Sequence, residues 1–232
     1  LLDGTQVNVV ARDAAGNTSQ PGSTVVDAQP PATPIISPSS GSGMLSGTAY
    51  PDSTLLLTIG NAAPVTVQVN ANGTWSYPIS GQLANGTQVS VVARDAVGNT
   101  SPAASLIIDT VPPAAPVVEP SNGLQLSGTA EAGSTVIITG PGGVVIGEAA
   151  VGAGGTWTFP VGTPLQHGVV ISVSARDAAG NTGPATAITI DAVAPAIPTI
   201  EDTNGLALRG TAEAGSTVTL TANGNTIATL RA

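Results

Sequence analysis

Apolar and small polar residues alternate along most of this chain in short runs, and Gly, Pro, Asn and Asp lie between the runs. This period of two predicts β-strands, and about seven of them fit between residues 110 and 191. No helical period competes with the alternation. The strands are expected near residues 115–119, 124–130, 135–140, 144–151, 156–161, 169–177 and 184–191.

The alternating pattern is itself repeated along the chain. The segment ARDAAGN that begins at Ala11 returns as ARDAVGN at Ala93 and as ARDAAGN at Ala175, a period of 82 residues. Small units that repeat in this way are separate modules, each with its own modest core. We therefore expect the tail of one module at 1–27, complete modules at 28–109 and 110–191, and the start of a fourth at 192–232, in a natural protein that extends both ways.

Alternation also assigns the predicted strands an inner face. Trp75 and Trp157, one period apart, are expected to be the bulkiest core residues of their modules. The other predicted core residues of the third module are Leu124, Leu126, Gly128, Ala130, Val136, Ile138, Ile171, Val173 and Ala175. This arrangement predicts an all-β fold of tandem immunoglobulin-like β-sandwich modules placed end to end, with a related β-sandwich topology as the main alternative.

Composition narrows the functional classes. The chain has 14 acidic residues against five basic ones and a net charge of -9, which disfavours nucleic acid and anionic membrane surfaces and favours cations. With one His and no Cys, it has no zinc set and no Ser-His or Cys-His pair, so we expect no enzyme activity. We also expect no membrane insertion, because no apolar run approaches the length of a spanning helix.

Topology brings several polar residues together. If the strands run alternately up and down, the loops after the second, fourth and sixth strands meet where the chain enters the module. For the third module this pole would collect Glu131, Asp177 and Asn181, together with Asp109 from the preceding linker. Calcium suits carboxylate and amide oxygens without His or Cys, and is the cofactor we predict. The alternative is that Asp177 only accepts hydrogen bonds from the backbone of its own turn.

Several segments resemble the bacterial Ig-like repeats of giant repetitive surface adhesins. They are ARDAAGN, the GTAEAGS segment at 128–134, the GTWTF segment at 155–159 and the Asp-x-x-x-Pro linker, and the resemblance covers the whole chain. It implies calcium bound between modules of a long stalk. It also implies type I secretion, a secreted or bacterial cell-surface location, and a role in adhesion and biofilm formation.

The resemblance places the calcium ligands unevenly among the modules. The fullest site is Asp109, Glu131 and Asp177, and the fourth module retains Asp191 and Glu213. In the second module Tyr50 replaces the glutamate, which leaves Asp27, Asp95 and a displaced Asp52 for a weaker site.

Each linker is rich in proline. Segments 27–34 and 109–116 contain three prolines each and 191–198 contains two, which predicts a rigid rod whose partners are the neighbouring repeats. The alternative for the joints is an ordinary linker between independent modules. The alternative function is a glycan-binding or protein-binding accessory module of an extracellular enzyme or receptor. A host or matrix ligand would be bound through regions outside this segment.

Overall fold

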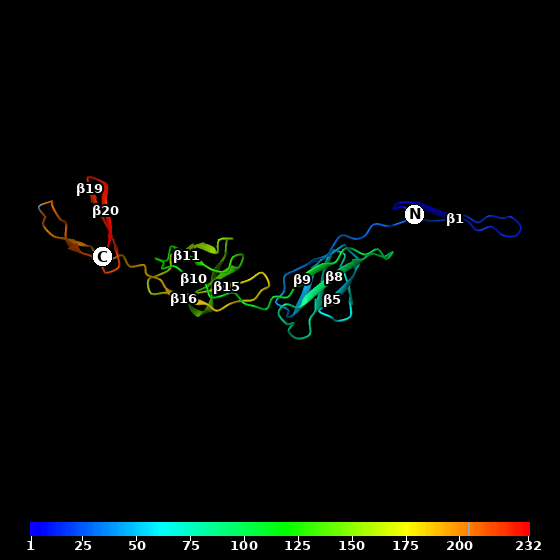
Figure 1. Ribbon diagram of the computed structural model, residues 1–232, viewed down its shortest axis with the longest axis horizontal. Helices are drawn as coiled ribbons and strands as arrows, with labels where there is room; N and C mark the ends of the chain where they lie inside the picture. The colour runs from blue at the N-terminus through cyan, green and yellow to red at the C-terminus, as the bar shows by residue number, and fades with distance from the viewer. Residues whose placement is uncertain (204) are drawn as a thin grey trace.

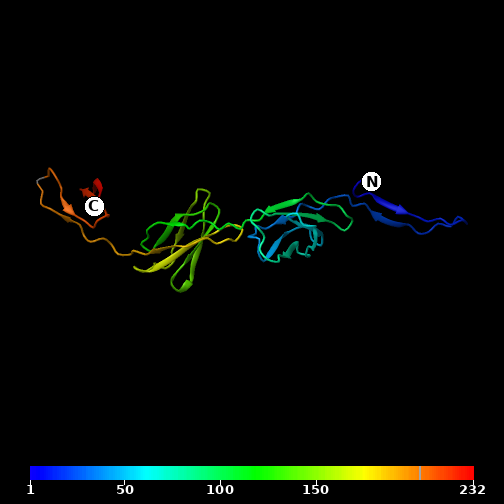
Figure 2. The same cartoon turned by 60° about the horizontal axis from the view of Figure 1, so that its bottom comes forward.

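The computed structural model describes residues 1–203 and 205–232. Two β-sandwiches lie end to end in the middle of an elongated chain, with further hairpins on either side of them (Figure 1). The same end-to-end order is visible when the molecule is turned (Figure 2). In the described part of the chain the only helical element is one 3-10 turn, η1 (Pro141–Gly143).

The first sandwich has seven strands in two antiparallel sheets. The sheet order is β3-β4-β7 in one layer and β6-β5-β8-β9 in the other. The strands are β3 (Ile35–Ile36), β4 (Met44–Thr48), β5 (Thr54–Ile59), β6 (Val65–Gln68), β7 (Thr74–Pro78), β8 (Gln88–Arg94) and β9 (Ala104–Ile107).

The second sandwich repeats this topology, with sheets β10-β11-β14 and β13-β12-β15-β16. Its strands are β10 (Val117–Val118), β11 (Gln125–Thr129), β12 (Thr135–Thr139), β13 (Val145–Ala150), β14 (Thr156–Pro160), β15 (Val170–Arg176) and β16 (Thr186–Thr189). Each strand lies within a range predicted from the sequence. The predicted immunoglobulin-like sandwich is therefore confirmed, whereas the exact module boundaries stay a prediction.

Each sandwich encloses its own core, built from the inward rows that the alternation predicted. Trp75 and Trp157 are each only 2% exposed. Leu126, Val136, Ile138, Ile171, Val173 and Ala175 are buried, as predicted. The prediction for Leu124 is wrong, because this side chain is 56% exposed. It precedes β11 and follows Gly123, whose φ of +85° turns the chain before the alternation begins.

The glycine of the repeated Ser-Gly-Thr segment allows two strands to approach closely. A Cβ on Gly128 would lie 2.0 Å from the carbonyl oxygen of Val117, and one on Gly47 would lie 1.9 Å from that of Ile35. Gly210 has the same relation to Thr199. The first strand of each module therefore packs directly against the glycine in the second strand. Any other residue at this glycine position would displace the backbone of the first strand.

The linker prolines belong to the sandwich that follows them. Pro113 and Pro116 are buried, as are Pro31 and Pro34 at the preceding joint. Thr186 of β16 donates a hydrogen bond to the carbonyl of Pro116. A Cβ on Gly183 would lie 2.0 Å from the carbonyl oxygen of Pro113, so the linker also lies against the segment before β16.

The flanking segments form exposed hairpins. Residues 1–27 contain β1 (Gln6–Val9) paired with β2 (Gly22–Val25). Residues 192–232 contain β17 (Thr199–Ile200), β18 (Gly210–Thr211), β19 (Thr217–Ala222) and β20 (Asn225–Arg231). No described residue in these two segments is buried.

Candidate functional site

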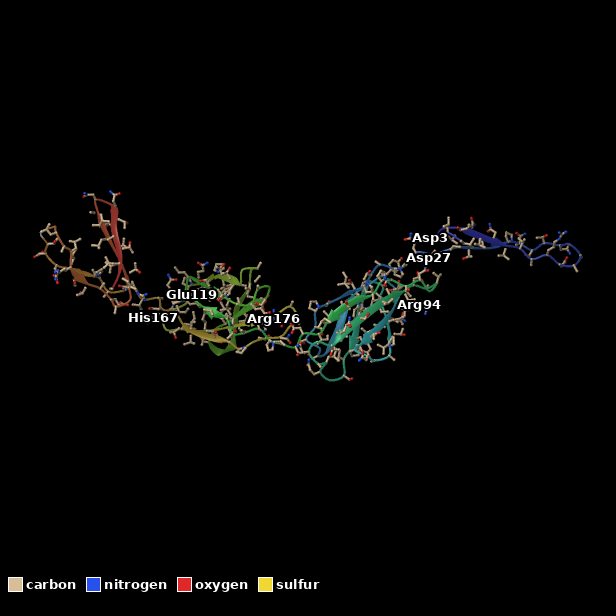
Figure 3. The ribbon with its side chains drawn as sticks, viewed as in Figure 1. Asp3, Asp27, Arg94, Glu119, His167 and Arg176 are labelled. Atoms are coloured by element: carbon tan, nitrogen blue, oxygen red, sulfur yellow. The ribbon has the colours of Figure 1, made fainter. Side chains whose placement is uncertain are left out.

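The loop after β15 forms a tight turn around the carboxylate of Asp177. The backbone N–H of Asn181 donates to Asp177 Oδ1 at 2.9 Å, and Asn181 Nδ2 donates to Asp177 Oδ2 at 2.8 Å. Gly180 supplies the φ of +93° that the turn requires. Figure 3 places Arg176, at the end of β15, on the side of the second sandwich that faces the first, and His167 on the opposite side. The turn therefore lies at the pole where the chain enters the module, as the topology predicted.

The same turn recurs in the other repeats. Asn99 Nδ2 donates to Asp95 Oδ2 at 2.8 Å, and Asn17 Nδ2 donates to Asp13 Oδ2 at 2.8 Å. For Asp13, hydrogen bonds from Asn17 hold the pKa of the carboxyl below its usual value. For Asp95, burial raises the pKa, but the hydrogen bonds from Asn99 and its neighbours outweigh burial and lower it. The hydrogen bonds expected under the alternative interpretation of these aspartates are therefore present.

The linker aspartates also fold their own backbone. Oδ1 of Asp27, Asp109 and Asp191 accepts a hydrogen bond from the N–H two residues later, at 3.2, 2.9 and 3.1 Å. Such Asx turns fix the start of a loop. The same local turn therefore begins each linker.

The preceding module holds the start of each linker through one further side chain. Asn85 Oδ1 accepts from the N–H of Thr110 at 3.0 Å, and Asp3 Oδ1 accepts from the N–H of Ala28 at 2.8 Å. At the equivalent position, His167 Nδ1 lies 3.2 Å from Asp191 Oδ1. The sequence did not lead us to expect this contact with the linker. The polar character of the position in all three repeats was the available signal.

The following module also reaches the linker. Asn181 Nδ2 donates to the carbonyl of Asp109 at 2.8 Å, and Asn99 Nδ2 donates to the carbonyl of Asp27 at 3.1 Å. Both hydrogen bonds join residues of adjacent modules that are 72 positions apart. The two joints are therefore built in the same way.

A cavity of about 310 Å³ lies between the two sandwiches. Asp109, Glu131 and Asp177, the three carboxylates of the fullest predicted site, all line it. Its remaining walls are Pro38, Ser39, Leu106 and Ile107 of the first sandwich and Ala132, Gly133, Ser134, Ala178 and Ala179 of the second. The three acidic residues therefore border the same cavity, and their role as a site stays a prediction.

Oxygen donors of the kind that calcium prefers surround this cavity, but they are not gathered around one point. Across residues 1–203 and 205–232, no group of three or more His, Cys, Asp or Glu side chains is arranged to hold a metal ion. Asp177 and Asp109 already accept hydrogen bonds, and Glu131 is exposed. The side chains offer the oxygen ligands that calcium prefers, but they are not spaced to coordinate one ion. Calcium binding therefore stays a prediction.

The remaining predicted ligands lie apart. Asp52 has a left-handed φ of 59° in an exposed turn, and no hydrogen bond joins it to Asp27 or Asp95. In the last module, Glu213 Oε2 accepts from the N–H of Ala196 at 3.4 Å and so contacts the linker that begins at Asp191. No helix in the described segments is long and apolar enough to cross a membrane.

Comparison with known families and curated proteins gave one clear result. The bacterial Ig domain family matches residues 30–109 and again residues 112–192. No curated protein matches the chain significantly.

Three solved structures illustrate what this chain is similar to. The BSP domain of a biofilm associated protein is 26% identical with a TM-score of 0.34, and the match covers 70% of this chain and 30% of that one. The fibronectin(III)-like modules of Clostridium thermocellum CbhA are 19% identical with a TM-score of 0.37, covering 68% and 93%. A cytokine receptor complex is 12% identical with a TM-score of 0.30, covering 69% and 97%. This chain therefore spans less than a third of the length of the biofilm associated protein structure.

Proposed function

Because this chain belongs to the bacterial Ig domain family, we propose that its sandwiches are non-catalytic stalk repeats of a secreted bacterial surface adhesin. The observation that carries this proposal is the construction of the joint. At the joints 27–34 and 109–116, the linker starts on one module, buries two of its prolines in the next, and receives a hydrogen bond from that next module. Modules connected in this way extend the chain in one direction. Such a stalk would hold an adhesive region away from the cell and support adhesion and biofilm formation.

The second part of the proposal is that calcium stiffens the joint between the two sandwiches. Asp109, Glu131 and Asp177 line one cavity there, and carboxylates that share a cavity carry like charges that repel one another. A divalent cation would relieve this repulsion. Glu131 is exposed, so its side chain has freedom to turn toward the cavity when an ion binds. The joint before the first sandwich offers Asp27, Asp95 and Asp52, and we expect it to bind calcium more weakly.

Calcium titration by calorimetry, with small-angle scattering in calcium and in chelator, tests this proposal. We expect calcium to lengthen the average shape and to raise the melting temperature, because ligands that bind only the native state stabilise it. Asp109→Ala and Glu131→Gln should each weaken calcium binding by about tenfold or more, since even outer-shell changes cost that much at metal sites.

The matched control is Glu119→Gln. It removes the same charge as Glu131→Gln from an exposed glutamate that does not line the cavity, so calcium affinity should not change. Equal affinities for Asp109→Ala, Glu131→Gln and the unmodified chain would show that the ligands are assigned wrongly. A shape and melting temperature that do not respond to calcium would contradict stiffening by metal.

A further inference from the structure

The side-chain amide of the asparagine that ends each Asp-Ala-x-Gly-Asn turn has two partners at both joints. Asn181 Nδ2 donates at 2.8 Å to Asp177 Oδ2 in its own turn and at 2.8 Å to the carbonyl of Asp109 in the preceding module. Asn99 Nδ2 does the same, at 2.8 Å to Asp95 Oδ2 and at 3.1 Å to the carbonyl of Asp27. An amide nitrogen carries two hydrogens, so each asparagine uses both.

The turn orients this amide before it reaches the linker. Asn181 is half-buried, and its own backbone N–H donates to the same carboxylate that holds its side chain. A side chain that is ordered in advance loses little further conformational entropy when it makes another contact. Asp177 therefore acts on the joint through Asn181 and is itself a positioning residue.

The carbonyl that receives the hydrogen bond is equally well fixed. The N–H of Asp109 donates to the carbonyl of Ser39 at 3.3 Å, which ties this residue to the first sandwich. The next residue, Thr110, donates to Asn85 Oδ1 of the same sandwich. The bond from Asn181 thus connects two backbone segments that are each held by hydrogen bonds to their own sandwich.

We infer that Asn99 and Asn181 lock the orientation of each module on its predecessor without a metal ion. The inference deepens the proposed stalk function, on which it rests, because it assigns stiffness to one amide per joint. Removing Asn181 leaves both sandwiches folded but lets them rotate about the linker. A lock of this kind restricts bending even where calcium is scarce.

Distance measurements between two spin labels test the lock in the full chain. The chain has no cysteine, so Ser76→Cys and Thr158→Cys, at equivalent exposed positions of β7 and β14, give one label on each sandwich without background. In chelator we expect one narrow distance distribution for the otherwise unmodified chain. Asn181→Ala should abolish the narrow peak and give a broad distribution.

Two further variants make the result specific. Asn99→Ala is the matched control, because it changes the same turn at the other joint and should leave the narrow peak intact. Asn181→Asp keeps the size of the side chain but replaces the donor with an acceptor that faces the carbonyl of Asp109, so it should broaden the distribution as well. Unchanged fluorescence of Trp157 would show that the second sandwich of each variant is folded.

The same measurement in calcium separates this inference from the calcium proposal. A peak that is narrow in chelator and in calcium, and broad for Asn181→Ala, supports the lock and contradicts stiffening by calcium. A peak that is broad in chelator and narrow only in calcium supports the metal and overturns the lock. Narrow peaks for Asn181→Ala and Asn181→Asp in chelator would also overturn it.

Discussion

Single carboxylates in this protein hold loops in shape. Asp95 accepts four hydrogen bonds from its own turn, through the N–H groups of Val97, Gly98 and Asn99 and the side chain of Asn99. Hydrogen bonds to the ionised form of a carboxyl stabilise that form. The repeated aspartates therefore contribute to the native loop whether or not an ion is bound.

This role predicts a defined response to acid. The pKa of Asp95 lies below its usual value of 3.8 in the folded chain, so ionisation stabilises the native state above that pH. The contribution is lost as the pH falls through the folded pKa. We expect the melting temperature of the first sandwich, followed by Trp75 fluorescence, to drop on acidification below pH 3.8. Asp95→Asn should start lower at neutral pH and drop less on acidification.

Asp52→Asn is the control for this measurement, because Asp52 lies in an exposed turn and accepts no hydrogen bond from a neighbouring turn residue through its side chain. It should follow the unmodified chain at every pH. An Asp95→Asn variant with the full acid response would show that the turn does not depend on the ionised carboxylate.

Individual site residues could be predicted from the sequence only as far as topology fixes them. The alternation of strand directions was enough to bring Asp109, Glu131 and Asp177 to one cavity. It gave no indication that Asn181 reaches back to Asp109, or that Asn85 holds Thr110. Those contacts depend on the path of the linker, and this path cannot be predicted because the linker sequence has no periodic pattern.

Strands were the most predictable elements, because burial on one side imposes the period of two. The exception at Leu124 arose at a strand end, where Gly123 turns the chain and the alternation has no meaning. The close contact between β10 and β11 could not be predicted from the alternation either. The sequence shows that the glycines recur, but it does not show which strand packs against them.

That contact makes Gly128 the most sensitive position of β11. A Cβ there would meet the carbonyl of Val117 at 2.0 Å, and because the obstructing atoms belong to the backbone of β10, no rotamer change can relieve the contact. We expect Gly128→Ala to lower the free energy of unfolding by about 3 kcal/mol, as overpacking does in closely packed sites. Urea unfolding monitored at Trp157 would measure this loss.

Gly154→Ala provides the comparison for Gly128→Ala. A Cβ on Gly154 would meet no atom within 4 Å, so the free energy of unfolding should change by only about 0.5 kcal/mol or less. Similar losses for the two variants would mean that glycine flexibility, rather than the contact with β10, sets the stability.

At the scale of the whole molecule, the described residues form two separate cores. One includes Leu57 and Trp75, the other includes Ile138 and Trp157, and the two clusters have no residue in common. The linker and the loop contacts described above connect them. A core substitution in one sandwich should therefore change the free energy of unfolding of that sandwich and not of the other.

The two tryptophans allow this independence to be measured, since each sandwich contains one. Ile138→Ala should cost the second sandwich about 2–5 kcal/mol, as large-to-small core changes do. In a Trp75→Phe background the remaining fluorescence of Trp157 should report this loss. In a Trp157→Phe background, the transition reported by Trp75 should not move, and an equal shift there would contradict separate cores.

The docking of the linker on the second sandwich determines how the protein bears load. Pro113 lies against Gly183 and Pro116 against Thr186, so the linker and the last strand advance side by side in the same direction. A pull on the two ends of the chain therefore slides these segments past each other along their length. Their contacts share the force and do not open one at a time. The second sandwich is thereby suited to resist tension.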